Sequence, residues 1–217
     1  MNEDVAAKVA EFLLQIKAVK LNPNQPYTWA SGWKSPIYCD NRITLSYPSI
    51  RTFIRQAFAK MIEDRFGKPD IIAGVATAGI PQGVLVAEAL ALPYCYVRPT
   101  MKGHGLKNQV EGEISEGQNV VIIEDLISTG KSCLGVVSAL RKRNLFVKGV
   151  ASIFDYGFDE SNKAFKEAKC SYASLTNYDV LIEQALEANY ITEEELGPLL
   201  AWKKDPANWD SPKIEQD

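Results

Sequence analysis

The chain has 217 residues, 46% hydrophobic and 24% charged, which is ordinary for a globular protein that needs no disulfide or metal to fold. Its net charge of −3 argues against nucleic-acid binding, because nucleic-acid-binding proteins usually carry a basic excess. The acidic, amphipathic first residues do not resemble a signal peptide, and no apolar run approaches the roughly 18 residues of a membrane span, so we expect a cytoplasmic protein with no membrane partner.

The N-terminal 45 residues predict a helix followed by irregular structure. Apolar side chains repeat with helical spacing over residues 3–18. Residues 19–45 are rich in proline, glycine and aromatic side chains and predict loops and short strands. A second helix is expected over 48–66, with proline in its first turn and Gly67 after its last.

From residue 70 onward, apolar strands alternate with helices. Strands are expected at 70–75, 93–98, 119–123 and 146–154, and helices at 81–92 and 129–144. Because the strands are apolar on both faces, they predict an α/β fold whose central, mostly parallel sheet is flanked by helices. The basic run 141–143 is expected to stabilise the C-terminus of its helix.

The tail predicts two further helices, at 178–188 and 192–203, and Thr192 with Glu195 forms a potential capping box for the second. We therefore expect one domain over 1–217. It would comprise an N-terminal helix and loop region (1–45), an α/β core (46–175) and a C-terminal helical extension (176–217).

The cysteines do not predict a zinc site. Cys39, Cys95, Cys133 and Cys170 form no CxxC pair, and His104 is the only histidine. Reduced, partly buried thiols are the expected state.

The run IIEDLISTGKS, residues 122–132, ends like a nucleotide-binding P-loop but is not one. The first glycine of a P-loop would stand at position 125, where the chain has Asp125 preceded by Glu124. Two carboxylates at that place would repel a polyphosphate.

The same run suits a ribose 5-phosphate. Carboxylates accept hydrogen bonds from a sugar diol, and the small residues that open the next helix offer N–H and hydroxyl donors to a phosphate. A simple helix N-cap is the structural alternative, although it does not explain two adjacent acids directly after a buried strand.

The segment VVIIEDLISTGKS, residues 120–132, resembles the phosphoribosyl pyrophosphate (PRPP) signature of type I phosphoribosyltransferases. The resemblance implies that family's fold, with Glu124 and Asp125 on the ribose hydroxyls and Leu126, Ile127, Ser128, Thr129 and Gly130 around the 5-phosphate. Lys131 and Ser132 complete the expected PRPP-binding run.

A second segment, SGWKSPIYCDNR at 31–42, resembles the N-terminal hood of orotate phosphoribosyltransferases, whose pattern is SG..SP.Y.D.R. In that family the hood covers the base, so Lys34, Tyr38 and Arg42 are expected to bind orotate, whose carboxylate suits an arginine. Ser128 and Tyr156 are the other expected orotate contacts. A packed hairpin with solvated charges is the alternative.

A third segment, YVRPTMKGHGLKNQVEG at 96–112, resembles the family's catalytic loop at Arg98, Lys102 and His104. A long cationic loop suits capture of the departing pyrophosphate. In the family this loop closes over the partner subunit's active site, which implies a homodimer.

The segment GVATAGIPQG at 74–83 occupies the place of the family's pyrophosphate loop, which implies that Thr77, Ala78 and Gly79 bind PRPP. Three positions depart from the pattern. Ala78 stands near a common lysine, Pro99 replaces a second basic residue, and Tyr156 lies where many relatives have an arginine to orotate.

The resemblance implies transfer of phosphoribosyl from PRPP to orotate, giving orotidine 5′-monophosphate and pyrophosphate, in pyrimidine biosynthesis. Lys102, Arg98, His104 and Asp125 are the expected catalytic residues. Mg²⁺ is the expected cofactor, carried by substrate with no direct protein ligand.

Two alternative functions remain open from the sequence. A purine phosphoribosyltransferase would share residues 120–132 but not the hood. A regulator on the same fold would bind PRPP and DNA without the loop cations.

Overall fold

The computed structural model describes residues 2–29, 32–98 and 109–209. The chain opens with helix α1 (Glu3–Gln15), whose apolar face is buried. Four short strands follow: β1 (Val19–Leu21), β2 (Tyr27–Thr28), β3 (Lys34–Ser35) and β4 (Ile37–Cys39). They pair as two antiparallel ladders, β1 with β4 and β2 with β3, which together form the hood. A 3₁₀ helix, η1 (Asn41–Ser46), connects the hood to the core.

A six-stranded sheet forms the centre of the molecule. Its strands, in spatial order, are β10 (Tyr172–Asn177), β9 (Phe146–Asp155), β8 (Asn119–Ile127), β5 (Ile71–Val75), β6 (Tyr94–Val97) and β7 (Val110–Glu111). All neighbours are parallel except the edge strand β7, which runs antiparallel to β6. The predicted mostly parallel sheet is confirmed.

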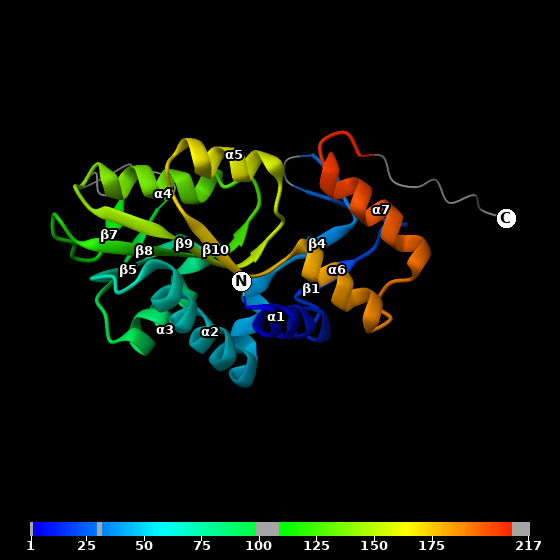
Figure 1. Cartoon of the computed structure of the whole chain (residues 1–217), viewed down its shortest axis with the longest axis horizontal. Coiled ribbons are helices and arrows are strands. Elements are labelled where there is room, and N and C mark those ends of the chain that lie inside the picture. Colours follow the sequence, from blue (N-terminus) through cyan, green and yellow to red (C-terminus); the bar gives the residue numbers. More distant parts are fainter. Residues whose placement is uncertain (1, 30–31, 99–108, 210–217) are drawn as a thin grey trace.

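Helices cover both faces of this sheet (Figure 1). Helices α4 (Lys131–Arg141) and α5 (Asp159–Glu167) cover one face, and α2 (Pro48–Phe66) and α3 (Gly79–Leu90) cover the other together with α1. Strand β8 is apolar at successive positions because helices cover both of its faces. Val120 and Ile122 pack with residues of α4 on one face, and Val121 and Ile123 pack with residues of α1 and α2 on the other.

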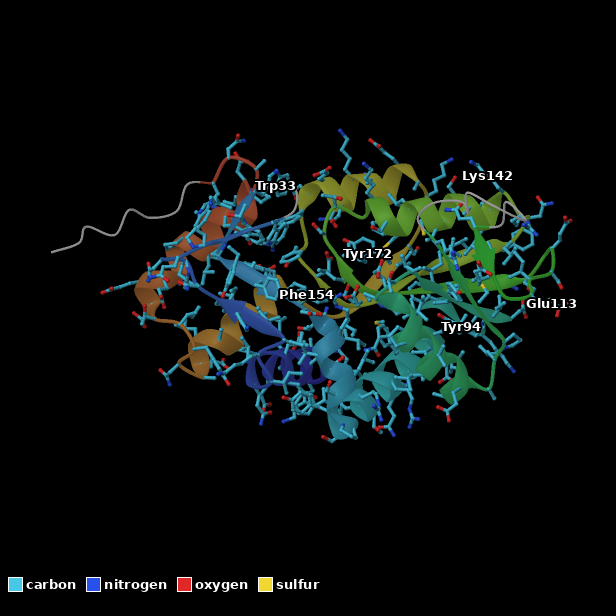
Figure 2. All side chains as sticks on the ribbon, turned by 180° about the vertical axis from the view of Figure 1, so that it is seen from behind. Trp33, Tyr94, Glu113, Lys142, Phe154 and Tyr172 are labelled. Atoms are coloured by element: carbon cyan, nitrogen blue, oxygen red, sulfur yellow. The ribbon has the colours of Figure 1, made fainter. Side chains whose placement is uncertain are left out.

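The two helices predicted for the C-terminal extension are present, and the first packs against the N-terminal helix. Helix α6 (Tyr178–Glu187) contacts α1, and α7 (Glu193–Lys204) follows it. The predicted capping box of Thr192 and Glu195 is present at the start of α7. Figure 2 shows Trp33 of the hood beside these C-terminal helices.

Several elements differ from the sequence-based expectations. Strand β8 does not end at residue 123 but runs to Ile127, because β9 continues to pair with it up to Ile127 opposite Asp155. Helix α5 and the two edge strands, β7 and β10, were not predicted. Of the basic run 141–143, Arg141 bonds the carbonyls of Ala168 and Lys169 after α5 rather than only stabilising its own helix.

Within the described part of the chain, no helix is both long enough and apolar enough to cross a membrane.

Candidate active site

A cavity of about 300 Å³ lies at the carboxyl ends of β5 and β8, where ligands bind in open parallel sheets. It is lined by the loop after β5 and by the end of β8 with the turn into α4. Its lining residues are Val75, Ala76, Thr77, Ala78, Glu124, Asp125, Leu126, Ile127, Ser128, Thr129, Gly130, Lys131, Ser132 and Cys133. The predicted run 124–132 therefore lines one cavity together with Thr77 and Ala78 of the predicted pyrophosphate loop.

Two carboxyl groups lie in the wall of this cavity, the buried Glu124 and the half-buried Asp125. Glu124 is 5% exposed, and one of its oxygens accepts a hydrogen bond from the Asp125 main-chain N–H at 3.1 Å. Its other oxygen accepts from the Cys133 thiol, with 3.7 Å between sulfur and oxygen. Burial, followed by the neighbouring charge of Asp125, raises the pKa of Glu124 to about 9, and burial also raises the pKa of Asp125. Without a ligand, the pair Glu124 and Asp125 therefore tends to hold a proton. A ligand with hydroxyl groups could form hydrogen bonds with both carboxyl groups.

The turn into α4 leaves the first N–H groups of that helix without a side-chain cap. Its N-cap is Gly130, in the left-handed conformation with φ of 79°, and no side chain of the described residues bonds the first turn. The alternative of a simple Ser, Thr or Asp cap is therefore wrong. Free N–H groups and the positive end of the helix dipole suit a phosphate.

The residue that precedes α3, Ala78, lines the same cavity from the neighbouring strand. As the N-cap of α3, it makes no side-chain hydrogen bond. A Cβ on Gly79 would lie 2.4 Å from the main-chain oxygen of Ile123, so the close approach of α3 to β8 requires glycine at this position. Gly79 itself does not line the cavity. The uncapped start of α4 and the N-cap residue of α3 thus line one cavity.

Each of the three predicted hood residues contacts a neighbouring side chain of the hood region. Lys34 donates to the Thr28 hydroxyl at 2.8 Å, and the exposed Tyr38 ring packs 5.7 Å from that of Tyr27. Arg42 forms a two-pronged ion pair with Asp40 at 2.7 and 2.9 Å, and these bonds lower the pKa of the Asp40 carboxyl. An orotate carboxylate would have to compete with Asp40 for this guanidinium.

Tyr156 is buried in the core rather than open to the cavity. It is 2% exposed and stacks on Phe158 with 5.3 Å between ring centroids. Trp29 of the hood and Trp202 of α7 also pack against its ring (5.2 and 5.6 Å). The Tyr156 ring therefore packs beneath the hood and supports it. A direct contact of Tyr156 with orotate remains a prediction.

Arg98 is at the end of β6 and does not line the described cavity. Its side chain pairs with Glu111 of β7 (3.2 Å), and its main-chain N–H donates to the carbonyl of Gln109. These contacts anchor both ends of the predicted catalytic loop at the sheet edge. Lys102 and His104 lie outside the described residues, and so does Pro99.

Sequence reasoning did not identify two buried amides near the site, Asn41 and Gln82. Asn41 donates to the main-chain carbonyl of Asp125 at 2.8 Å. Gln82 of α3 donates to the Thr44 hydroxyl at 3.1 Å. The sequence gives no indication of either contact. Asn41 stands at a position that the hood pattern leaves unspecified, and Gln82 lies within a predicted helix.

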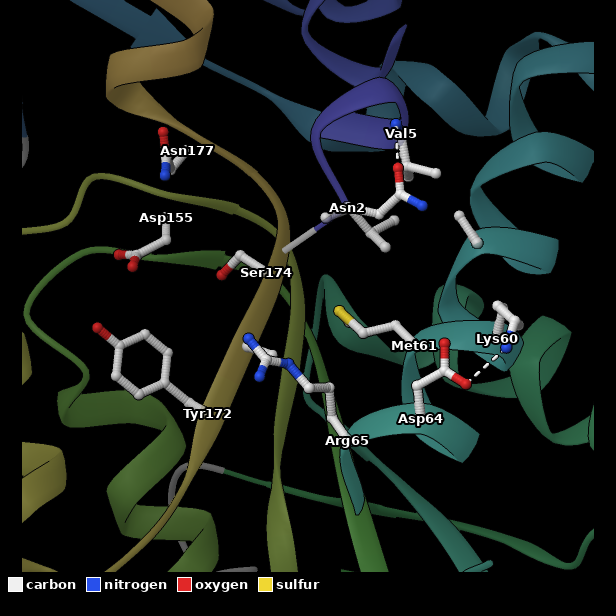
Figure 3. Close-up of a pocket in the computed structure, with 13 residues that line it drawn as sticks. Asn2, Val5, Lys60, Met61, Asp64, Arg65, Asp155, Tyr172, Ser174 and Asn177 are labelled. Atoms are coloured by element: carbon white, nitrogen blue, oxygen red, sulfur yellow. Dashed lines mark hydrogen bonds and ion pairs between the residues drawn. The ribbon is translucent and has the colours of Figure 1, made fainter. Parts of the chain in front are cut away.

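A second cavity, of about 440 Å³, lies between α1, α2 and the edge strand β10. Figure 3 shows Arg65 extending from α2 towards Ser174. The ion pair of Lys60 and Asp64 lies on the same helix, farther from Ser174. None of the predicted site residues lines this cavity. The larger cavity is therefore separate from the predicted PRPP site.

Comparison with known proteins agrees with this site. The model of the phosphoribosyl transferase domain matches residues 46–180. Proteins named orotate phosphoribosyltransferase are 54% identical over 204 residues in Bacteroides thetaiotaomicron and 52% identical over 205 residues in Listeria innocua. Each alignment covers 94% of this chain, and it covers 96% and 98%, respectively, of the two relatives.

A solved structure supports the same relation. The crystal structure of orotate phosphoribosyltransferase from Aeropyrum pernix superimposes with a TM-score of 0.74 at 26% identity, covering 85% of this chain and 99% of that one. The matched domain, the near full-length relatives and the shared fold agree with the acid pair and the hood. The chain belongs to the orotate phosphoribosyltransferase family, the transferases that join a phosphoribosyl group to orotate in pyrimidine biosynthesis.

Proposed function

We propose that the cavity at 124–132 binds PRPP and that the hood orients orotate above it, so that the base displaces pyrophosphate from the sugar. One observation carries this proposal: the buried Glu124, the half-buried Asp125 and the uncapped start of α4 line the same cavity as Thr77 and Ala78. The carboxyl groups match the ribose hydroxyls, the turn 126–130 matches the 5-phosphate, and the loop Thr77–Ala78 matches the pyrophosphate.

Breaking the bond between the sugar and pyrophosphate leaves positive charge on the ribose and negative charge on the leaving group. Electrostatic placement, rather than proton transfer, therefore contributes most of the catalysis. Asp125, which lines the cavity, is proposed to stabilise the positive charge that develops on the ribose. Arg98, Lys102 and His104 are proposed to neutralise the departing pyrophosphate, and the hood residues Lys34, Tyr38 and Arg42, with Ser128, to orient orotate.

The donor set of the cavity fits Mg²⁺ carried by the substrate. Carboxylate oxygens are the hard ligands that this ion accepts, directly or through its waters, and both acids lie beside the predicted ribose position. When bound, the ion would neutralise diphosphate charge. Glu124 and Asp125 would hold the ribose hydroxyls and the water shell around it.

We also infer a homodimer in which the loop from Arg98 closes over the partner's site. Both ends of this loop are fixed at the edge of the sheet by the pairing of β6 with β7. Segments 1–45, 46–175 and 176–217 are proposed to act as one domain, because side chains from all three share one core cluster. The four cysteines are free thiols, which suits the proposed cytoplasmic location.

The test is an absorbance assay of orotate with PRPP and Mg²⁺, with adenine, hypoxanthine and uracil as parallel substrates. We expect magnesium-dependent consumption of orotate alone. Consumption of a purine would refute the assignment of the hood while retaining the PRPP site. Tight PRPP binding without turnover of any base would instead indicate a regulator.

A further inference from the structure

A chain of buried hydrogen bonds links the hood to the PRPP cavity through Asn41. This residue begins η1, directly after the hood strand β4, and is 1% exposed. Its side-chain N–H donates to the main-chain carbonyl of Asp125 at 2.8 Å, across 84 residues of sequence. Its side-chain oxygen accepts from the Cys39 thiol of β4, with 3.4 Å between the atoms. Asn41 is thus bonded on one side to the hood and on the other to the acid pair.

The same turn is also bonded to α3. The Thr44 hydroxyl donates to the main-chain carbonyl of Asn41 at 2.6 Å and accepts from the Gln82 amide at 3.1 Å. Thr44 is fully buried, and Gln82 is 1% exposed. Because α3 starts at the predicted pyrophosphate loop, one polar network connects the three segments that hold orotate, ribose and pyrophosphate.

We propose that Asn41 is a positioning residue that fixes the backbone of Asp125 relative to the hood and thereby holds the two substrates in register. This inference rests on the proposed sites for PRPP and orotate. Asn41 does not line the predicted PRPP cavity. It acts through the Asp125 carbonyl, whose position determines where the adjoining carboxyl group meets the ribose.

The physical reason is the cost of leaving a part-buried carbonyl without its donor, the side chain of the buried Asn41. The Asp125 carbonyl accepts from Asn41, and apolar substitution would leave both it and the Cys39 thiol without this partner. A site held by such bonds loses rate when it loosens, because small displacements of reacting groups are costly. Loss of one such bond corresponds to about tenfold in a rate or binding constant.

The first test compares Asn41→Ala with Ser161→Ala. Ser161 of α5 is fully buried and also makes a side-chain bond to a main-chain carbonyl, that of Phe158 at 2.8 Å, but it does not line the predicted PRPP cavity. We expect Asn41→Ala to lower kcat/KM for both PRPP and orotate by about tenfold or more. Ser161→Ala should lower the Tm to a similar extent and leave kcat/KM for both substrates near the values of the unsubstituted protein. Equal kinetic effects in the two variants would overturn the proposal.

Asn41→Asp gives a sharper test because it keeps the size of the side chain. When protonated, the introduced carboxyl group can still donate to the Asp125 carbonyl; when ionised, it can only repel it. The charged and titratable groups near this position are Cys39, Asp40, Arg42, Glu124 and Asp125. We expect the rate of Asn41→Asp, relative to the unsubstituted protein at each pH, to rise as the pH falls. A constant ratio would contradict the hydrogen-bond role.

Gln82→Met tests the same network if substitutions at Asn41 prevent folding. Methionine has a side chain of similar length but cannot donate a hydrogen bond to Thr44, so we expect kcat/KM to fall, by less than in Asn41→Ala. Calorimetric titration with PRPP and Mg²⁺ gives a readout that does not require turnover. If the unsubstituted protein does not consume orotate, the proposed function fails. If it does, and these variants bind and turn over normally, only the role of Asn41 fails.

Discussion

Trp202 of the C-terminal helix donates its indole N–H to the main-chain carbonyl of Lys34 in the hood, at 3.0 Å and across 168 residues of sequence. The ring is fully buried and packs edge-on against Trp29, with 5.5 Å between centroids. A second bond joins the same two parts of the chain, from the Asn24 amide to the Glu195 carboxyl group at 3.1 Å. Helix α7 therefore holds the hood in place, which gives the C-terminal extension a role in the predicted orotate site.

Trp202→Phe should weaken orotate binding more than PRPP binding. Phenylalanine retains most of the packing but leaves the Lys34 carbonyl without its donor, which costs on the order of 1–3 kcal/mol. We expect the KM for orotate to rise about tenfold and the KM for PRPP to change little. Trp209→Phe is the matched control, because Trp209 only packs at the rim of the core. Equal changes in the two KM values would contradict a role specific to the hood.

Lys102→Ala should lower kcat much more than it weakens binding. Its predicted role is to neutralise charge that develops only as pyrophosphate departs, and such interactions stabilise the transition state more than the bound substrates. A loss in kcat on the order of 10²–10³-fold is expected, with a small change in the KM for PRPP. Lys142→Ala, an exposed lysine after α4, is the control. An unchanged kcat in Lys102→Ala would refute the role.

Glu124 should make the stability of the ligand-free protein depend on pH. Its pKa in the folded protein is about 9, against an ordinary value of 4.5, because of burial and the neighbouring Asp125. Between these values the folded state keeps a proton that the unfolded state releases. The free energy of unfolding therefore falls as the pH rises through this interval.

Glu124→Gln should flatten this dependence, since the amide does not titrate. We expect the variant to gain stability relative to the unsubstituted protein as the pH rises from about 5 to about 9, measured by denaturant unfolding. Glu116→Gln, at an exposed position, is the control. An identical pH slope in Glu124→Gln and the unsubstituted protein would exclude Glu124 as its source.

Gly130→Ala should disrupt the phosphate turn. The residue has φ of 79°, which is unfavourable for alanine, and its Cβ would lie 2.8 Å from the Phe165 ring of α5. We expect lower stability and weaker PRPP binding, measured by Tm and calorimetry. Gly135→Ala in the same helix is the control. A Cβ there meets no atom within 4 Å, so that variant should gain about 0.5–1 kcal/mol and bind PRPP normally.

The segments that bind phosphate and ribose could be predicted because their chemistry lies in contiguous residues. Run 120–132 combines a buried strand, two acids and a small-residue turn, and the structure brings it to the same cavity as Thr77 and Ala78. Helix α5 and strand β10 were missed because each has little apolar character of its own. Phe165 is the only large apolar side chain buried in α5, and Leu175 the only one in β10.

The contacts that position the site could not be predicted, because they join distant parts of the chain without a periodic pattern. Asn41 and the Asp125 carbonyl are 84 residues apart in sequence, and Trp202 and the Lys34 carbonyl are 168 residues apart, so only the folded chain brings each pair together. Tyr156 was assigned to orotate from the arginine that many relatives carry there, but the structure surrounds its ring with other aromatic side chains.

The aromatic packing beneath the hood has an optical consequence. Trp29 and Trp33 stack on the β2–β3 hairpin with 6.4 Å between centroids, and Trp202 contacts Trp29 from the C-terminal helix. Three of the four tryptophans in the chain therefore absorb and emit at the place where the base is expected to dock. Any shift of the hood changes their mutual distances and thus the emission intensity. Base binding can accordingly be followed in real time by intrinsic fluorescence, without an added label.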